Sequence, residues 1–257
     1  GRLEVFGVEG LPEVGRGDDL AGMIAAAVEL LDGDVVVVTQ KVVSKAEGAM
    51  VAVDPDDPRG HRQVVEDESV RVLRRRGDLV ISETKHGFVC ANAGVDLSNV
   101  ERGQAALLPE DSDRSARRIR DGLRARAGVE VAVIVSDTFG RPWRRGVTDV
   151  AIGCAGIGAI LDLRGTPDAL GREMQVTEVA VVDGPVGVWS DRGDSRATSS
   201  TAATMIAATA AAMASNAAMA GFLRYQGRSG NQNASGANGS KLGSVGGSVG
   251  SSTSSAE

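Results

Sequence analysis

Hydrophobic positions near the start of the chain follow first a helical and then a strand spacing. Apolar side chains recur three or four residues apart from Leu20 to Leu31, directly after Asp18 and Asp19. This spacing predicts a helix with one buried face, capped at its start by the aspartates. The β-branched run 35–39 then predicts a strand that is buried on both faces. The chain therefore combines both kinds of element from its first forty residues.

The same pattern continues as strands separated by polar loops. Helices are expected over residues 66–76 and over the arginine-rich residues 112–127. Further strands are expected at residues 3–8, 78–82, 87–90, 129–135 and 177–182. Small apolar residues fill the segment 151–163, so backbone segments can approach each other closely there.

The composition changes sharply after Asp183. Residues 201–219 are dominated by Ala, Thr and Met, whereas residues 227–257 are almost entirely Gly, Ser and Asn. Alanine favours helix, and Gly/Ser-rich chains behave as flexible coils. We therefore expect a folded domain over 1–183, an Ala-rich and helical segment over 184–226, and a disordered tail over 227–257.

Composition and charge exclude several classes of function. The 257 residues carry a net charge of -6 and only 3% aromatics, a poor match for nucleic acid, which is bound by Lys, Arg and stacking rings. Two cysteines, Cys90 and Cys154, are too few for a disulfide framework or a structural zinc site, and both are expected to be small buried hydrophobes. Because the sequence shows neither a signal-peptide pattern nor a long apolar stretch, we expect a cytoplasmic protein without membrane contacts.

Two aspartates are candidates for a metal site, because each is expected where a strand ends in a polar loop. They are Asp96 and Asp137, and Asp137 is followed by Thr138. Hard cations such as Mg²⁺ and Mn²⁺ prefer carboxylate and hydroxyl oxygens, so these three side chains would suffice. Alternatively, each aspartate only bonds its own backbone in a turn. The residues alone leave both interpretations open.

Basic residues near these positions suit an anionic ligand. Lys45 follows the strand at 35–39 and would place an ammonium group on a phosphate. Arg141, Arg144 and Arg145 come directly after the candidate metal residues, and guanidinium groups bind phosphate and carboxylate in a bidentate manner. Solvated surface charges would give the same pattern, so this signal alone is not specific.

Other catalytic signatures are absent. The sequence contains neither the phosphate-binding loop nor the dinucleotide fingerprint, and it offers no recognisable Ser/His/Asp or Cys/His triad. The two histidines, His61 and His86, lack metal-ligand spacing. A structural or positioning role is expected for both.

Four segments, taken in order, resemble the coenzyme F420-0:L-glutamate ligases, enzymes of coenzyme F420 biosynthesis. They are Glu9-Gly10-Leu11-Pro12, residues 39–48 (TQKVVSKAEG), residues 86–99 (HGFVCANAGVDLSN) and residues 136–141 (SDTFGR). The resemblance covers about residues 1–183. It is closest to the ligase domain of the actinobacterial form, which is commonly fused to a flavin-dependent domain.

The resemblance implies a GTP-dependent ligase that adds γ-linked L-glutamate to F420-0 through an acyl phosphate. It implies Mg²⁺ or Mn²⁺ as metal, K⁺ as a further candidate ion, and a mixed α/β (α+β) fold with mixed sheets and flanking helices in an intertwined homodimer. The implied catalytic residues are Asp137 and Lys45; the metal residues are Asp96, Asp137 and Thr138; the nucleotide residues are Gly10, Leu11, Pro12, Lys45 and Asn99.

Two other classes of function stay open at this point. The family continues after its last matched strand with a segment that closes over the nucleotide, and residues 184–226 do not align with it. A homologue without that segment would bind nucleotide or coenzyme without turnover. A scaffold that only oligomerises would explain the tail but not the clustered polar loops.

Overall fold

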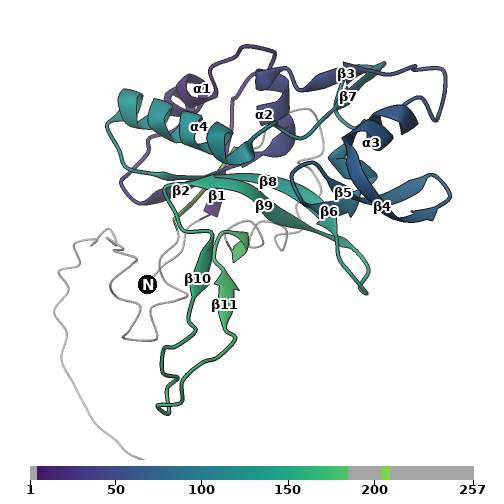
Figure 1. Ribbon diagram of the computed structural model, residues 1–257. Helices are drawn as coiled ribbons and strands as arrows, with labels where there is room; N and C mark the ends of the chain where they lie inside the picture. The colour runs from purple at the N-terminus through teal and green to yellow at the C-terminus, as the bar shows by residue number, and fades with distance from the viewer. Residues whose placement is uncertain (1–4, 185–203, 209–257) are drawn as a thin grey trace, which may run out of the picture. The chain divides into compact units, whose positions relative to one another are not determined.

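A five-stranded sheet occupies the centre of the computed structural model, which describes residues 5–184 and 204–208 (Figure 1). The strand order is β1-β12-β2-β8-β9. The bounds are β1 Val5–Val8, β2 Asp34–Thr39, β8 Ala132–Gly140, β9 Val147–Ala155 and β12 Thr204–Ala208. Strands β2 and β8 are parallel, whereas β8 and β9 form an antiparallel hairpin. The carboxyl ends of β2 and β8 therefore meet at one edge of the sheet.

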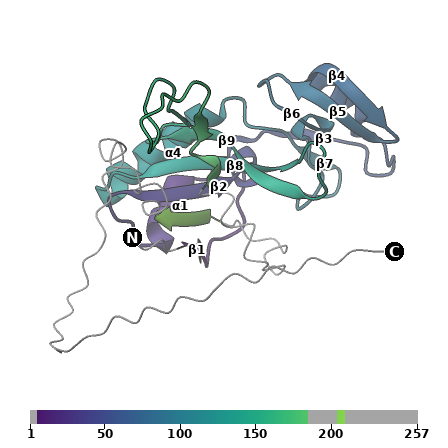
Figure 2. The same cartoon turned by 90° about the horizontal axis from the view of Figure 1, so that it is seen from below.

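Three helices cover one face of this sheet, and Figure 2 shows the same arrangement from below. They are α1 Leu20–Ala27, α2 Gln40–Glu47 and α4 Ser112–Ala127. Alternate residues of β2 serve two cores: Val36 and Val38 pack in the cluster that contains the helices, and Val35 and Val37 pack in a second cluster. The predicted burial of this strand on both faces is confirmed.

Helix α4 has the bounds that its sequence predicts. Asp111 caps its start, where the carboxylate accepts a hydrogen bond from Arg114 N at 2.8 Å, and Gly128 ends it with a left-handed φ of 70°. The helix approaches β9 so closely that a Cβ on Gly153 would clash with the backbone of Ser112. The small residues predicted to allow close backbone approach are therefore used in this way.

A smaller sheet lies beside the main one and carries its own hydrophobic cluster (Figure 1). It contains β4 Ser69–Arg76, β5 Leu79–Thr84 and β6 Val89–Ala91, all antiparallel. Its neighbours are α3 Arg62–Glu68, the 3-10 turn η1 Asn92–Gly94, and the paired strands β3 Met50–Ala52 and β7 Gln104–Ala106. The expected strands at 78–82 and 87–90 thus exist with shifted bounds.

The helix predicted over 66–76 is wrong for most of its length. Helix α3 ends at Glu68, and the following residues form β4, which pairs with β5 across a tight connection at Gly77. Gly77 has a φ of 61°, as a tight turn requires. Pairing with a neighbouring strand has overridden the helical preference of the arginine-rich sequence.

Three other elements differ from the sequence prediction, two in their boundaries and one in its existence. Helix α1 ends at Ala27 rather than Leu31, because Val28 is extended and Leu31 N donates to the Asp34 carboxylate at 2.9 Å. Helix α2 was not predicted at all. The strand expected to end at residue 135 continues to Gly140 as part of the β8–β9 hairpin.

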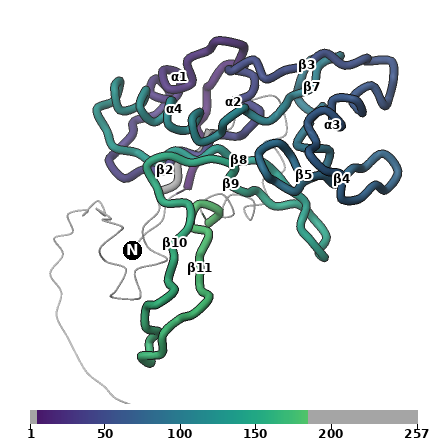
Figure 3. The backbone as a smooth tube through the Cα atoms, viewed as in Figure 1, coloured from purple at the N-terminus to yellow at the C-terminus, as the bar shows by residue number. Residues whose placement is uncertain are grey.

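Beyond β9 the chain forms a two-stranded ribbon that extends away from the main sheet (Figure 3). Its strands are β10 Ile160–Asp162 and β11 Glu178–Ala180, and the latter confirms the strand expected at 177–182.

In the Ala-rich segment the described residues Thr204–Ala208 form a strand rather than a helix. The remainder of that segment and the predicted tail at 227–257 lie outside the described residues. None of the helices in the described part of the chain is long and apolar enough to cross a membrane.

Candidate active site

The carboxyl ends of β2 and β8 bring together residues that are far apart in sequence. Thr39 at the end of β2 pairs with Ser136 on β8, and α2 starts at the next residue, Gln40. Asp137 and Thr138 therefore lie beside the start of α2. The expectation that Asp137 sits in a loop is wrong, because β8 continues through it. A register shift between Val135 and Ser136 changes the pairing with β9 just before the site, as bulges near active sites do.

Asp96 reaches this edge from the segment that follows η1. Its backbone exchanges two hydrogen bonds with Ala106, at 2.9 and 2.8 Å. Its carboxylate lies 2.8 Å from Lys41 Nζ and accepts a hydrogen bond from Ser98 N at 2.7 Å. Lys41 Nζ also donates to Ser98 Oγ at 2.7 Å. Lys41 thus connects the first turn of α2 to the Asp96 segment.

Two hydrogen bonds to the Leu107 carbonyl, and one between their donors, hold α2 in the position that this contact requires. Gln40 Nε2 donates to Ser44 Oγ at 2.7 Å and to the Leu107 carbonyl at 2.6 Å. Ser44 Oγ donates to the same carbonyl at 2.6 Å. Because Leu107 directly follows β7, to which Asp96 is joined, these bonds fix Lys41 relative to Asp96.

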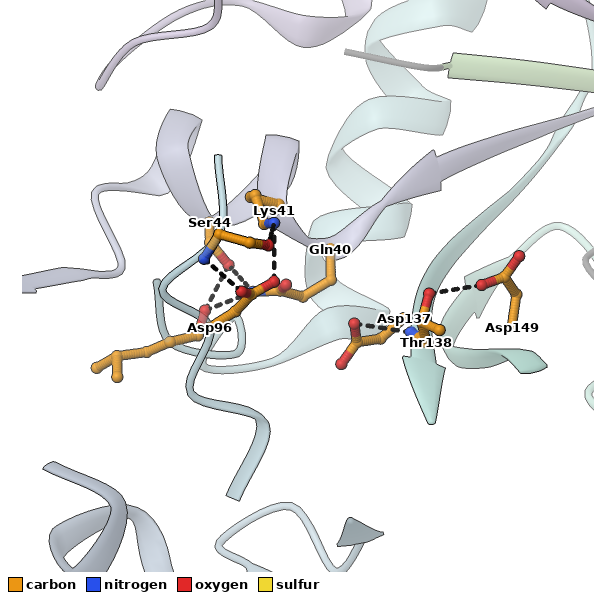
Figure 4. Close-up of polar contacts among 9 residues, drawn as sticks. Gln40, Lys41, Ser44, Asp96, Asp137, Thr138 and Asp149 are labelled. Atoms are coloured by element: carbon orange, nitrogen blue, oxygen red, sulfur yellow. Dashed lines mark hydrogen bonds and ion pairs between the residues drawn. The ribbon is translucent and has the colours of Figure 1, made fainter. Parts of the chain in front are cut away.

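Asp137 has a different set of partners. Its carboxylate accepts a hydrogen bond from Thr138 N at 2.8 Å, and Thr138 Oγ1 donates to the Asp149 carboxylate on β9 at 2.6 Å (Figure 4). Among the described residues, no Lys or Arg forms an ion pair with Asp137. Burial raises the pKa of Asp137 to about 6; the Thr138 amide opposes this rise, and the Asp96 charge adds to it. Asp137 is therefore a carboxylate whose charge is poorly compensated.

Asp96 shows the opposite balance. Burial alone would raise its pKa, but the hydrogen bonds from Lys41 and Ser98 outweigh burial and bring the pKa below its ordinary value. The two aspartates thus form an interacting pair, and within the described part of the chain it is Asp96 that forms an ion pair with Lys41.

The donor set fits a hard divalent cation. Asp96, Asp137 and Thr138 supply carboxylate and hydroxyl oxygens, the ligands that Mg²⁺ and Mn²⁺ prefer. Over residues 5–184 and 204–208, no group of three or more His, Cys, Asp or Glu side chains is arranged as a complete metal cage. A metal at this position would therefore keep oxygens from water or substrate, as Mg²⁺ commonly does.

The expected nucleotide residues lie near the two ends of α2. Lys45 is one helical turn after Lys41, about 6 Å further along the axis, and its ammonium pairs with the Glu13 carboxylate. Glu13 directly follows the expected residues Gly10, Leu11 and Pro12. The Leu11 side chain is buried in the main core, so its contribution to a ligand is limited to its backbone.

Asn99, the remaining expected nucleotide residue, is exposed beside Ser98 with a φ of 53°. It thus lies with the Lys41 and Asp96 group rather than with Lys45. The sequence-predicted residues therefore fall into two groups, one at each end of a single face of α2.

Sequence reasoning gave no role to Lys41, Ser98 or Asp149. Lys41 and Ser98 lie inside segments that carry the family resemblance, and that resemblance is the signal that could have found them. Lys41 also lies two residues after a buried strand. Asp149 meets Thr138 only because β8 and β9 pair in one particular register. Nothing in the local sequence around Asp149 indicates that register.

Two residues near the site are structural in character. His86 stacks on Phe88 with ring centroids 6.2 Å apart, and its buried Nδ1 has no hydrogen-bond partner among the described residues. Cys90 is buried, and burial together with the Asp137 charge raises the pKa of its thiol to about 11. Cys90 therefore stays a neutral thiol, in agreement with its expected role as a small buried hydrophobe.

Comparisons with known proteins cover the region that carries this site. A family model described as F420-0:Gamma-glutamyl ligase matches residues 10–188. The chain is similar to the Coenzyme F420:L-glutamate ligase of Methanothermobacter thermautotrophicus, with 42% identity over 200 residues, covering 70% of this chain and 79% of the relative. The protein of the same name from Methanopyrus kandleri is 43% identical over 200 residues, covering 71% and 79%. That of Haloarcula marismortui is 42% identical over 201 residues, covering 70% and 78%.

Proposed function

Because the chain belongs to the F420-0:Gamma-glutamyl ligase family, we propose that it joins L-glutamate to coenzyme F420-0 through a γ-linked amide bond. The family resemblance seen in the sequence is confirmed, and the chain is a member of a family of ligases. The observation that carries the proposal is the convergence of Asp96, Asp137 and Lys41 at the carboxyl ends of two parallel strands. This site lies entirely within the matched region.

Ligation of a carboxylate requires that it first become a better acyl donor. In the proposed reaction the γ-phosphoryl group of GTP is transferred to the terminal carboxylate of F420-0, and GDP leaves. The amine of L-glutamate then attacks the acyl phosphate, the new amide bond forms, and phosphate leaves with its electron pair. The protein supplies positioning and charge in this scheme, and no protein nucleophile is needed.

Asp96, Asp137 and Thr138 would hold Mg²⁺ or Mn²⁺. A bound divalent cation supplies compensation for the negative charge that builds up on the phosphoryl oxygens. Asp149 fixes the Thr138 hydroxyl through their 2.6 Å hydrogen bond. Lys41 keeps Asp96 ionised, since its ammonium lowers the pKa of that carboxyl.

The nucleotide would lie along α2. Lys45 and the backbone of Gly10, Leu11 and Pro12 would contact its phosphates from one end, and Asn99 would contact it from the other. Lys45 is mostly buried, and among the described residues its ion-pair partner is Glu13, whose own carboxylate is largely exposed. A phosphate can therefore take the place of Glu13 on Lys45, in a setting where electrostatic interactions are stronger than in water.

The test is an incubation of the purified protein with F420-0, L-glutamate, GTP and Mn²⁺. Mass spectrometry follows glutamate addition, and GDP release is measured in parallel. We expect addition of one or more glutamates with matching GDP release, and loss of both when the metal is chelated. Parallel reactions with Mg²⁺ in place of Mn²⁺, and with or without K⁺, identify the ions required.

A negative result in this test also has a specific interpretation. A folded protein that binds GTP but adds no glutamate and releases no GDP would support the alternative of a homologue without turnover, which the comparisons do not favour. The homodimer implied by the family resemblance stays a prediction. Light scattering on the same sample measures it directly.

A further inference from the structure

The tip of the β8–β9 hairpin holds an aromatic side chain fully in solvent. Trp143 has a relative exposure of 101%, the highest among the exposed large hydrophobic residues. Its backbone has a φ of 56°, a left-handed conformation that is rare and unfavourable for a bulky residue. Neither feature contributes to the packing of the described residues. A strained residue that gains nothing from packing is a candidate for binding.

Three arginines surround this tryptophan. Arg141 donates to the carbonyl of Arg145 and thereby closes the turn. Within the described part of the chain, none of Arg141, Arg144 and Arg145 forms a side-chain ion pair with a carboxylate. All three are exposed. On a chain with a net charge of -6, this tip is a local cationic surface that suits an anionic ligand.

The hairpin connects the tip rigidly to the carboxylate site. Its pairs run without a further register shift from Ser136 with Ala151 to Gly140 with Val147. Phe139, between the two ends, packs edge-on against Phe88 with ring centroids 5.9 Å apart. The three residues from Asp137 to Gly140 span about 10 Å of strand. The tip therefore lies at a fixed and moderate distance from Asp137.

We propose that Trp143 stacks on the deazaflavin ring of the coenzyme while the neighbouring arginines bind its phosphate. The inference rests on the proposed function, since it concerns the substrate of the same site. The deazaflavin ring is planar and aromatic, and the coenzyme also carries a phosphate in addition to the carboxylate that reacts. Trp stacks on planar rings, and Arg binds phosphate bidentately. The hairpin would thus hold the ring at its tip and the reacting carboxylate at Asp137.

A second copy of this chain fits the tip less well. Trp and Arg are both enriched in protein interfaces, so the side-chain types alone do not exclude such a contact. In a symmetric contact, however, the three arginines of one tip would face those of the other, and the two tips would repel each other. Charge and ring chemistry together favour an anionic aromatic ligand.

The test measures binding of F420-0 alone, without GTP or metal, from the anisotropy of its own fluorescence. Trp143→Ala is expected to weaken binding roughly 10-fold or more, because stacking on one ring contributes about 1–3 kcal/mol. Trp143→Phe keeps an aromatic ring and is expected to stay within about 3-fold of wild type by the same stacking argument. Leu170→Ala, at another highly exposed position, is the matched control and should leave binding unchanged.

Turnover separates this proposal from the proposed function. In an active enzyme, Trp143→Ala should raise KM for F420-0 and leave KM for GTP unchanged. A wild-type protein that binds F420-0 through Trp143 but adds no glutamate would remove the ligase proposal and keep this one.

Three outcomes would overturn the inference. They are equal F420-0 affinity of wild type and Trp143→Ala, no binding of F420-0 by the wild-type protein, and a loss of dimer mass in Trp143→Ala without a loss of affinity. The last would assign the tip to contact between copies. Because the indole is fully exposed, the melting temperature of Trp143→Ala should match that of wild type, and this control excludes unfolding as the cause of weak binding.

Discussion

The outer half of the β8–β9 hairpin, from Asp137 to the tip, differs in charge and in burial between its two ends. At one end, Asp137 is a partly buried carboxylate with no cationic partner among the described residues, and burial raises its pKa to about 6. At the other end, Arg144 and Arg145 are exposed to solvent at the hairpin tip. Within the described residues, neither Asp137 nor these arginines form an ion pair, although the Lys41 charge acts on Asp137 from a distance. Water solvates the arginines at little cost, whereas Asp137 carries a real energetic penalty.

This difference separates two tasks along one hairpin. An uncompensated buried carboxylate is destabilising unless it binds a cation, so the Asp137 end is suited to a metal. An exposed cationic and aromatic tip has no such penalty and is suited to recognition of an anionic substrate. The comparison predicts that changes at the buried end have large effects on turnover and stability, and that changes at the exposed tip have smaller effects on affinity.

The largest effect is expected from Asp137→Ala. Loss of this carboxylate should lower kcat by roughly 1000-fold or more, about 4 kcal/mol in the activation free energy. The fold should persist, since Asp137 contributes no apolar packing. Steady-state kinetics and a thermal melt measure the two effects. Asp162→Ala, at an exposed carboxylate on β10, should retain full activity. Normal turnover by Asp137→Ala would remove Asp137 from the site.

An intermediate effect is expected from Asp137→Asn in the absence of metal. The folded-state pKa of Asp137 lies above its ordinary value, so its contribution to stability is complete only below about pH 4 and is lost as the pH rises through about 6. Removing the charge should therefore stabilise the metal-free protein by about 1–3 kcal/mol at neutral pH.

Urea unfolding between pH 4 and 8 measures this difference. The gain should shrink toward zero as the pH falls to about 4, where Asp137 is protonated in both folded and unfolded chains. Glu29→Gln makes the same carboxylate-to-amide change at an exposed position and should show no such pH dependence. A constant gain at all pH values would contradict the buried-charge explanation.

The smallest effect is expected from Arg144→Gln at the hairpin tip. An exposed charged contact with phosphate is weak and screened by salt, so F420-0 affinity should fall by only about 2–5-fold at low ionic strength. The difference should fade in high salt, and kcat should not change. Fluorescence titrations at two salt concentrations measure it. Loss of kcat in this variant would place Arg144 in the chemistry instead.

Much of the main sheet could be predicted from the sequence because its signals are local. The run 35–39 is β-branched throughout, and β2 is buried on both faces as expected. Residues 112–127 combine an N-cap aspartate, a helical spacing and a C-terminal glycine, and α4 has these bounds. Asp96, Asp137 and Thr138 were also selected from the sequence, because oxygen ligands near strand ends are a recognisable pattern.

Other features could not be predicted because they depend on distant partners. Residues 69–76 contain many arginines, yet they form β4 because β5 pairs with them. Asp137 lies within β8 because β9 continues the ladder past the site. The role of Lys41 depends on Asp96, which lies far along the chain, beyond β3, α3 and the smaller sheet.

By itself, the amino-acid sequence determined the family, the mixed α and β character, the buried strand β2, the helix α4 and the oxygen ligands of the candidate site. Local spacing, capping residues and conspicuous motifs are enough for these features. Only the tertiary structure decided that Asp137 forms no ion pair within the described residues, that Lys41 serves Asp96, and that Trp143 stands exposed at the tip of the hairpin that carries Asp137. Charge compensation and exposure depend on which segments meet in space, and no local pattern contains that information.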